Sequence, residues 1–186
     1  DSCDIMHYLD TMAVDKQLYP QDPELRQQAE TLEELFDQKL GVATRNWGYY
    51  YAIQKPFKIA IAWGINAPWS EKIKCIIAIP RIPGLLRQKY NVTEASKEGA
   101  LKDIKEVFNV VNQRLNLGQQ YLLGNNLSSA DIIFAALASP VIRPEHHPVY
   151  NSQLSKLSTE MVEVINELRA TPAGELVMRM YREHRQ

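Results

Sequence analysis

Apolar residues recur every three or four positions along most of the chain, the spacing that places them on one face of an α-helix. The pattern predicts a short opening helix with one apolar side formed by Ile5, Tyr8, Leu9 and Met12. The next helix is expected to begin at Pro23, because Asp22 is a favourable N-cap and proline suits the first helical position. One long amphipathic helix is predicted over residues 23–54, with an apolar stripe of Leu25, Leu32, Leu35, Phe36, Leu40 and Ala43.

The second half of the chain predicts further helices. Thr93 is expected to cap a long helix that runs to about Leu117. The residues expected inside it are Leu101, Ile104, Val107, Phe108, Val111 and Leu115. Residues 139–152 contain three prolines and predict a loop, whereas residues 153–170 are predicted to be helical. The last helix is expected to start at Thr171 and Pro172.

The stretch YLLGNNLSSADIIFAALASP, residues 121–140, predicts a helix stop at Gly124 and a new helix capped by Ser128. In this capping box the Ser128 hydroxyl accepts from the Asp131 amide, and the Asp131 carboxylate reaches back to the Ser128 amide. The run that follows is apolar nearly all round, so the helix is expected to be central and buried.

Residues 54–92 differ from the rest of the chain. Four prolines, Pro56, Pro68, Pro80 and Pro83, prevent one long helix and predict two or three short ones. The segment is rich in isoleucine, and its charged residues are all Lys or Arg except Glu71. Three roles are compatible with this pattern: an extra helical layer over a pocket, a membrane-surface patch, or a partner site. No strand pattern persists, so the chain is predicted to be all-α.

Charge and cysteine content narrow the function classes. The formal net charge is −1, so no overall field favours nucleic acid as a partner. Cys3 and Cys75 form no CxxC motif, which argues against a disulfide framework or a zinc site. The longest apolar runs are far shorter than the ~18 residues of a membrane-spanning helix. With no secretory signal visible, a reducing, cytoplasmic location is expected.

Two stretches resemble the glutathione transferase family. DSCDIMHYLD at the start is similar to the acidic-Ser turn and helix that close that family's thioredoxin-like domain. YLLGNNLSSADIIFAALASPV resembles the Gly turn, capping box and core helix of its all-helical domain. The resemblance implies that residues 1–19 end a thioredoxin-like domain. Residues 20–186 then form an all-α, glutathione-transferase C-terminal-like bundle with a Pro-interrupted helical insertion at 54–92.

The function implied by the resemblance is conjugation or reduction of small electrophiles, as in detoxification, with glutathione as co-substrate. The family's catalytic residues lie in the thioredoxin-like domain, so no catalytic residue is expected in this chain, which should be inactive alone. The resemblance also implies a homodimer through the two long helices. The alternative is a non-enzymatic interaction or scaffold module of the same fold, because fold does not fix function.

Site residues follow from the same resemblance. Ser2, which fits an N-cap, would hold the γ-glutamyl carboxylate of glutathione, and Asp1 would hold its amino group. The alternative for both is a plain cap and a chain terminus. Cys3, near the positive end of the helix dipole, is a conceivable nucleophile, but a partly buried bystander is favoured.

An electrophile pocket is implied at the aromatic end of the long helix. Its candidates are Arg45, Trp47, Tyr50 and Tyr51, since flat rings hold apolar substrates and arginine pairs with anions. Packing in the core or at a dimer surface is the competing role for these residues. In the insertion, Trp63 and Trp69 are the residues to watch for peripheral membrane contact.

Glu145, His146 and His147 invite a metal-site interpretation. Adjacent histidines ligate one ion only if the backbone bends suitably, and the sequence shows no distant cluster to complete the sphere. A solvated loop without a metal is therefore favoured.

Overall fold

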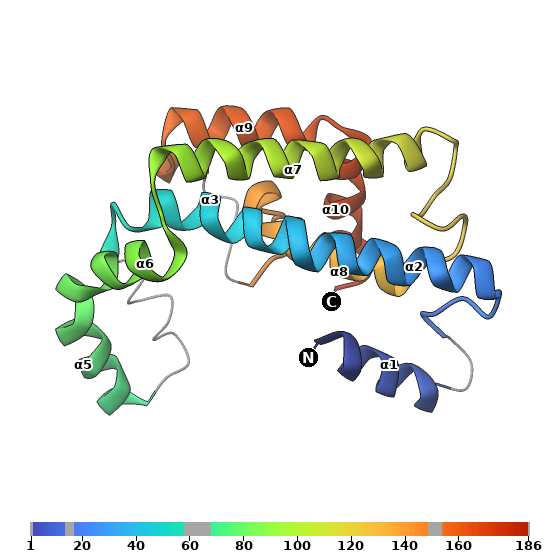
Figure 1. The fold of residues 1–186 in the computed structure, drawn as a ribbon, viewed down its shortest axis with the longest axis horizontal. Coiled ribbons are helices and arrows are strands. Elements are labelled where there is room, and N and C mark those ends of the chain that lie inside the picture. The colour runs from blue at the N-terminus through green and yellow to red at the C-terminus, as the bar shows by residue number, and fades with distance from the viewer. Residues whose placement is uncertain (1, 14–16, 58–67, 149–153, 186) are drawn as a thin grey trace.

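The long helix predicted over 23–54 forms the spine of the molecule. In the computed structural model, which describes residues 2–13, 17–57, 68–148 and 154–185, it consists of three continuous parts. These are α2 (Pro23–Leu35), a π-helical segment η1 (Phe36–Gly41) and α3 (Val42–Ala52), which cross the middle of Figure 1. Asp22 caps the start as predicted and accepts hydrogen bonds from the amides of Glu24, at 2.9 Å, and Leu25, at 3.0 Å.

The prediction of a continuous helix is confirmed to Ala52, but its stripe is not buried throughout. Phe36 and Leu40 are fully buried, whereas Leu25 is 37% exposed because it lies in the first turn, near the end of the bundle. The π segment ends at Gly41, where an added Cβ would lie 3.2 Å from the Leu137 side chain. The wide turn thus coincides with the close approach of a second helix.

Helix α7 (Glu94–Leu115) packs along α3, and α8 (Ser129–Ile142) lies beneath both in the core. Thr93 caps α7 through a box with Ser96. The ring of Phe134 on α8 lies 5.2 Å from that of Phe36 and 5.4 Å from that of Phe108. These contacts join the spine, α7 and α8 into one core, and they confirm the prediction of a central, buried α8.

The capping box at the start of α8 is present as predicted. The Asp131 carboxylate, at 0% exposure, accepts from the Leu122 amide at 2.9 Å, the Ser128 amide at 2.9 Å and the Ser128 hydroxyl at 2.5 Å. The predicted helix stop at Gly124 is wrong, because α7 already ends at Leu115. Gly124, with φ of 120°, instead closes a tight turn whose backbone pairs with Tyr121.

The loop predicted from 139 begins too early. Helix α8 continues through Pro140 to Ile142, because the Ala136 carbonyl, which loses its helical partner at the proline, accepts from the Ser139 hydroxyl at 2.8 Å. The carbonyls at the helix end find a partner on another helix. Arg169 donates to the carbonyl oxygens of Ile142, at 2.8 Å, and Arg143, at 2.7 Å. The backbone then turns at Arg143 in the left-handed region.

The C-terminal helices cover the far side of the core. The helix predicted over 153–170 is interrupted: a 3-10 turn, η3 (Leu154–Lys156), precedes α9 (Thr159–Arg169), whose start is capped by Ser158. Helix α10 (Pro172–Glu183) begins at the predicted proline. Every helix and turn in the described ranges is thus consistent with the predicted all-α class, and these ranges contain no β-strand.

Helices at both ends of the chain's spine lie outside the main bundle in Figure 1. Helix α1 (Ser2–Met12) lies beneath α2, as predicted for the chain start. From the broken segment 54–92, α5 (Trp69–Ala78), the turn η2 (Ile79–Arg81) and α6 (Ile82–Tyr90) extend from the other end. Helix α6 rests on α3 through a small separate apolar cluster of Ile53, Ile82, Leu86 and Val92. The prediction of short helices joined at prolines is confirmed over 69–90.

Candidate functional site

The four residues predicted for an electrophile pocket separate onto two sides of α3. Arg45 turns toward α6 and Tyr51 toward α7, whereas Tyr50 lies beside Lys97 of α7 and also packs against the apolar cluster that holds α6. Trp47 is fully buried in the core, with its ring 5.1 Å from that of Tyr51. The structure therefore gives Trp47 the packing role that was the alternative for this set.

The α6 side of the helix carries a cluster of two rings and two cations. The Tyr49 and Tyr90 rings lie 5.1 Å apart. The Arg45 guanidinium lies 5.1 Å from the centre of the Tyr90 ring, and the Lys89 ammonium lies 5.3 Å from it. In the described part of the chain, neither cation forms an ion pair with a carboxylate. Two positive charges on aromatic rings suit an anionic or aromatic ligand.

The opposite side of α3 meets α7 and α9 around Lys97, whose side chain is only 8% exposed. The Lys97 ammonium pairs with Glu160 at 2.8 Å and also with Glu94. It lies 4.9 Å from the centre of the Tyr50 ring and 6.0 Å from that of Tyr51. The Tyr50 hydroxyl donates to Glu94. This Lys97 network ties three helices together.

The electrostatics of the Lys97 network oppose a role in proton transfer. Hydrogen bonds to Glu160 and Glu94 raise the pKa of Lys97 well above its usual value, so the ammonium stays charged. Burial and the nearby Glu160 likewise raise the pKa of Tyr51, which keeps the phenol neutral. A general base or an activated nucleophile needs the opposite shifts. The network is therefore a structural junction rather than an acid–base site.

The start of the chain holds the predicted glutathione-binding residues. Asp1 lies outside the described residues, and the side chains of Ser2 and Cys3 are also undescribed. Helix α1 includes Ser2, which is therefore helical rather than the non-helical cap that the sequence predicted. Their proposed contacts with glutathione remain predictions.

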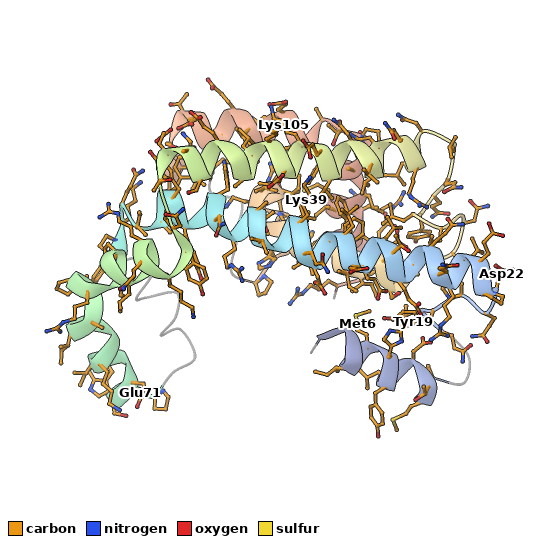
Figure 2. All side chains as sticks on the ribbon, in the orientation of Figure 1. Met6, Tyr19, Asp22, Lys39, Glu71 and Lys105 are labelled. Carbon is orange, nitrogen blue, oxygen red and sulfur yellow. The ribbon has the colours of Figure 1, made fainter. Side chains whose placement is uncertain are left out.

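Helix α1 is anchored to the bundle by polar and aromatic contacts. The rings of His7 and Tyr19 stack at 4.1 Å, and the buried Tyr19 hydroxyl donates to Glu33 at 3.1 Å. Asp10 accepts from the Leu18 amide, and the Leu18 carbonyl accepts from the Ser129 amide at 3.0 Å. Figure 2 shows Met6 and Tyr19 between α1 and the spine. Apolar spacing along the chain does not point to this junction, because ring stacking and polar contacts hold it together.

The far side of α1 is apolar and exposed. The residues predicted to form one face, Ile5, Tyr8, Leu9 and Met12, are between 57% and 65% exposed. Four large apolar side chains at helical spacing thus form an exposed apolar surface on this side of α1.

A shallow groove of about 250 Å³ runs between the spine and α7. Its lining includes Val42 and Asn46 on one side and Gly99 and Asp103 on the other, and none of the predicted pocket residues. Lys39 pairs across it with Asp103 at 3.3 Å. Small side chains and a partly exposed Val42 make this face suitable for close helix contact.

The histidine loop shows no metal-binding geometry in the part of the chain that is described. No group of three or more His, Cys, Asp or Glu side chains lies close enough to hold an ion there. His147 lies beside Tyr181, with ring centres 5.3 Å apart, and burial lowers its pKa. Among the described helices, none is long and apolar enough to cross a membrane.

Comparison with known proteins gives a match to a family model. The family model "Glutathione S-transferase, C-terminal domain" matches residues 71–158. The match runs from α5 to just past η3 and includes the Ser128–Asp131 capping box as well as α6, which lies in the segment 54–92. No curated protein and no solved structure matched the chain.

Proposed function

We propose that the protein conjugates or reduces small electrophiles with glutathione, because the family model of the glutathione S-transferase C-terminal domain matches residues 71–158. The match at residues 71–158, on an all-helical bundle with a buried capping box, is the observation that carries the proposal. Glutathione is the co-substrate that the family uses. The thiolate would be stabilised by a thioredoxin-like domain, of which residues 1–19 form the last helix and linker.

The geometry of α1 supports this domain division. The helix is fixed to the bundle on one side by the contacts of Tyr19 and Asp10. Its other side presents the exposed apolar face of Ile5, Tyr8, Leu9 and Met12. A helix at the border of two domains needs both features: fixed contacts with one domain and an apolar face for the other. Asp1 and Ser2, at its start, are the proposed ligands of the glutathione amino and γ-glutamyl carboxylate groups.

The cluster of Arg45, Tyr49, Tyr90 and Lys89 is proposed to receive the electrophile. Aromatic rings offer flat apolar contact, and an unneutralised guanidinium favours a substrate with a carboxylate or another anionic group. Tyr50 and Tyr51, the other predicted pocket residues, are held in the Lys97 network and would act by positioning α3. Proximity of the two bound reactants would then supply much of the rate.

The electrophile proposal is tested with two aryl electrophiles that differ only in a carboxylate, using the full-length protein and glutathione. Arg45→Gln should raise KM for the anionic electrophile about ten-fold, because a charge-assisted hydrogen bond is lost, and leave the neutral one unchanged. Lys102→Gln, at an exposed position on α7, is the matched control. Equal effects of Arg45→Gln on both substrates would remove the assignment of this cluster.

The non-enzymatic module is the second candidate function. It rests on the fold alone, because a fold does not fix function. Retention of the full-length protein on immobilised glutathione separates the two. Specific retention with turnover supports the transferase, whereas absence of both favours the module.

A homodimer through the spine and α7 is part of the same proposal. The groove of Val42, Gly99 and Asp103 lies between these two helices, and close helix contact there would cover the exposed Val42. Sedimentation velocity of wild type and Val42→Glu tests it. A dimer in the wild type that becomes a monomer in the variant is expected, and a wild-type monomer would refute the arrangement.

A further inference from the structure

Helix α5 carries an exposed apolar stripe that the proposed function does not use. Trp69, Ile73 and Ile77 are spaced four residues apart, so they lie along one side of the helix. They are 77%, 44% and 65% exposed. We call these three residues the α5 stripe.

The α5 stripe lies apart from the bundle. In Figure 1, α5 projects at the lower left, away from α7, α8 and α9, and Figure 2 shows Glu71 at its outer end. Its main contact with other described elements is the η2 turn that follows it. The α5 stripe can therefore contact an extended surface, such as a membrane or another protein.

Charge distinguishes this region from the remainder of the protein. All charged residues of segment 54–92 are Lys or Arg except Glu71, although the whole chain has a formal net charge of −1. Glu71 itself is paired with Lys74 at 2.7 Å. Arg81 in η2 and Arg87 in α6 are exposed and form no ion pair with a described residue. A local excess of positive charge therefore accompanies the stripe.

We propose that the α5 stripe and the basic residues beside it dock the protein on an anionic lipid surface. A tryptophan favours the boundary between headgroups and acyl chains, and isoleucines insert just below it. Arginine and lysine near such a surface gain from its negative potential. A ten-residue helix lies in the interface and does not cross the bilayer. The net positive charge selects an anionic membrane over an uncharged apolar partner.

The test is sedimentation of the full-length protein with vesicles of phosphatidylcholine alone or mixed with phosphatidylglycerol. Binding is expected only to the mixed vesicles, and it should weaken in high salt because the Debye length falls to about 3 Å at 1 M. Binding to neither vesicle, or to both equally, overturns the proposal.

Two pairs of variants assign the binding to the stripe and its charges. Trp69→Ser combined with Ile73→Ser should weaken binding at least ten-fold, through loss of inserted apolar area. Arg81→Gln combined with Arg87→Gln should weaken it about five-fold per arginine. The controls, Leu117→Ser at an exposed apolar position and Lys102→Gln at an exposed basic one, should bind like wild type.

Stability and size measurements separate docking from internal packing. The stripe variants should unfold at the same temperature as wild type and keep its sedimentation coefficient, since their side chains are exposed. If the stripe variants lose stability or change oligomeric state while vesicle binding is unaltered, the stripe covers protein instead, and the proposal is wrong. Glutathione turnover is a separate readout, so either proposal can fail alone.

Discussion

Replacing Asp131 by alanine tests whether the buried capping box is the strongest local determinant of the bundle. The carboxylate is completely buried and accepts from two backbone amides, of Leu122 and Ser128, and from the Ser128 hydroxyl. Alanine removes all three acceptor contacts at once. The hydroxyl can rotate to another acceptor, but the two amides are fixed by the backbone.

The expected cost follows from the two stranded amides. A buried donor left without a partner costs about 1–3 kcal/mol, so the pair costs about 2–6 kcal/mol. Loss of the desolvation penalty of the buried carboxylate offsets part of this. The net expectation is a loss of about 3 kcal/mol in the free energy of unfolding.

The second capping box of the same chain provides the control. Thr93 and Ser96 form a similar box at the start of α7, but Thr93 is exposed and Ser96 is only half-buried. Thr93→Ala should cost only about 0.5–1 kcal/mol, because water replaces the lost partner. The two boxes therefore differ in burial and in the extra hydrogen bond that Asp131 accepts from the Leu122 amide.

The measurement is urea unfolding followed by circular dichroism, with both variants and the wild type compared at a common m-value. Asp131→Ala should shift the midpoint at least twice as far as Thr93→Ala. Equal shifts would show that burial of the box adds nothing, and the account of α8 as the central helix would lose its energetic basis.

Three further outcomes are expected from unfolding measurements. Gly174→Ala should destabilise by about 3 kcal/mol or more, because its Cβ would lie 2.1 Å from the Leu168 carbonyl oxygen. Gly84→Ala, in open space on α6, should stabilise by up to about 1 kcal/mol, and a harmless Gly174→Ala would contradict the packing of α9 against α10. Lys97→Met should lower the free energy of unfolding by about 1–2 kcal/mol in thermal unfolding. Lys105→Met should lower it by less than about 1 kcal/mol, because its ion pair with Glu167 is exposed. Equal losses in the two variants would refute the role of the Lys97 network. Burial raises the pKa of Asp131 in the folded state, so the folded protein holds this proton more tightly than the unfolded chain does. The free energy of unfolding of the wild type should therefore fall, relative to that of Asp131→Asn, as the pH rises just above the usual carboxyl pKa. A constant difference between the two proteins across that pH range would show that the shift is absent.

The helices and their starts could be predicted because their signals are local. Asp22, Thr93, Ser128 and Thr171 each cap a helix where the sequence placed one. Such caps depend on residues within one turn, and the apolar spacing then fixes which face packs inward. The same reasoning failed at Pro140, because Ser139 satisfies the carbonyl that the proline leaves free. Arg169, which is remote in sequence, then binds the carbonyls at the helix end.

Helical geometry alone could have predicted that Arg45 lies on a different side of α3 from the other predicted pocket residues. At about 100° per residue, Trp47, Tyr50 and Tyr51 fall within roughly a third of the helix circumference, and Arg45 lies on the opposite side. Tyr49, four residues after Arg45, shares its side and contacts the same Tyr90 ring. What the sequence could not supply was Tyr90 itself, since the path between α3 and α6 passes through a proline-broken segment.

The proposed substrate cluster and the proposed membrane surface depend on the same small piece of packing. Arg45 and Tyr49 form the proposed substrate cluster only while α6 holds the Tyr90 ring beside them. Helix α6 also connects through η2 to the α5 stripe. Helix α6 is fixed to α3 by the cluster of Ile53, Ile82, Leu86 and Val92, which is separate from the main core. A separate cluster of this size can open without unfolding the bundle, because the free energy of local opening follows the apolar area that holds the segment. Docking of α5 on a lipid surface would therefore restrain α6 and favour the arrangement in which Arg45 and Tyr90 lie together, so the two proposed surfaces are coupled through one apolar contact.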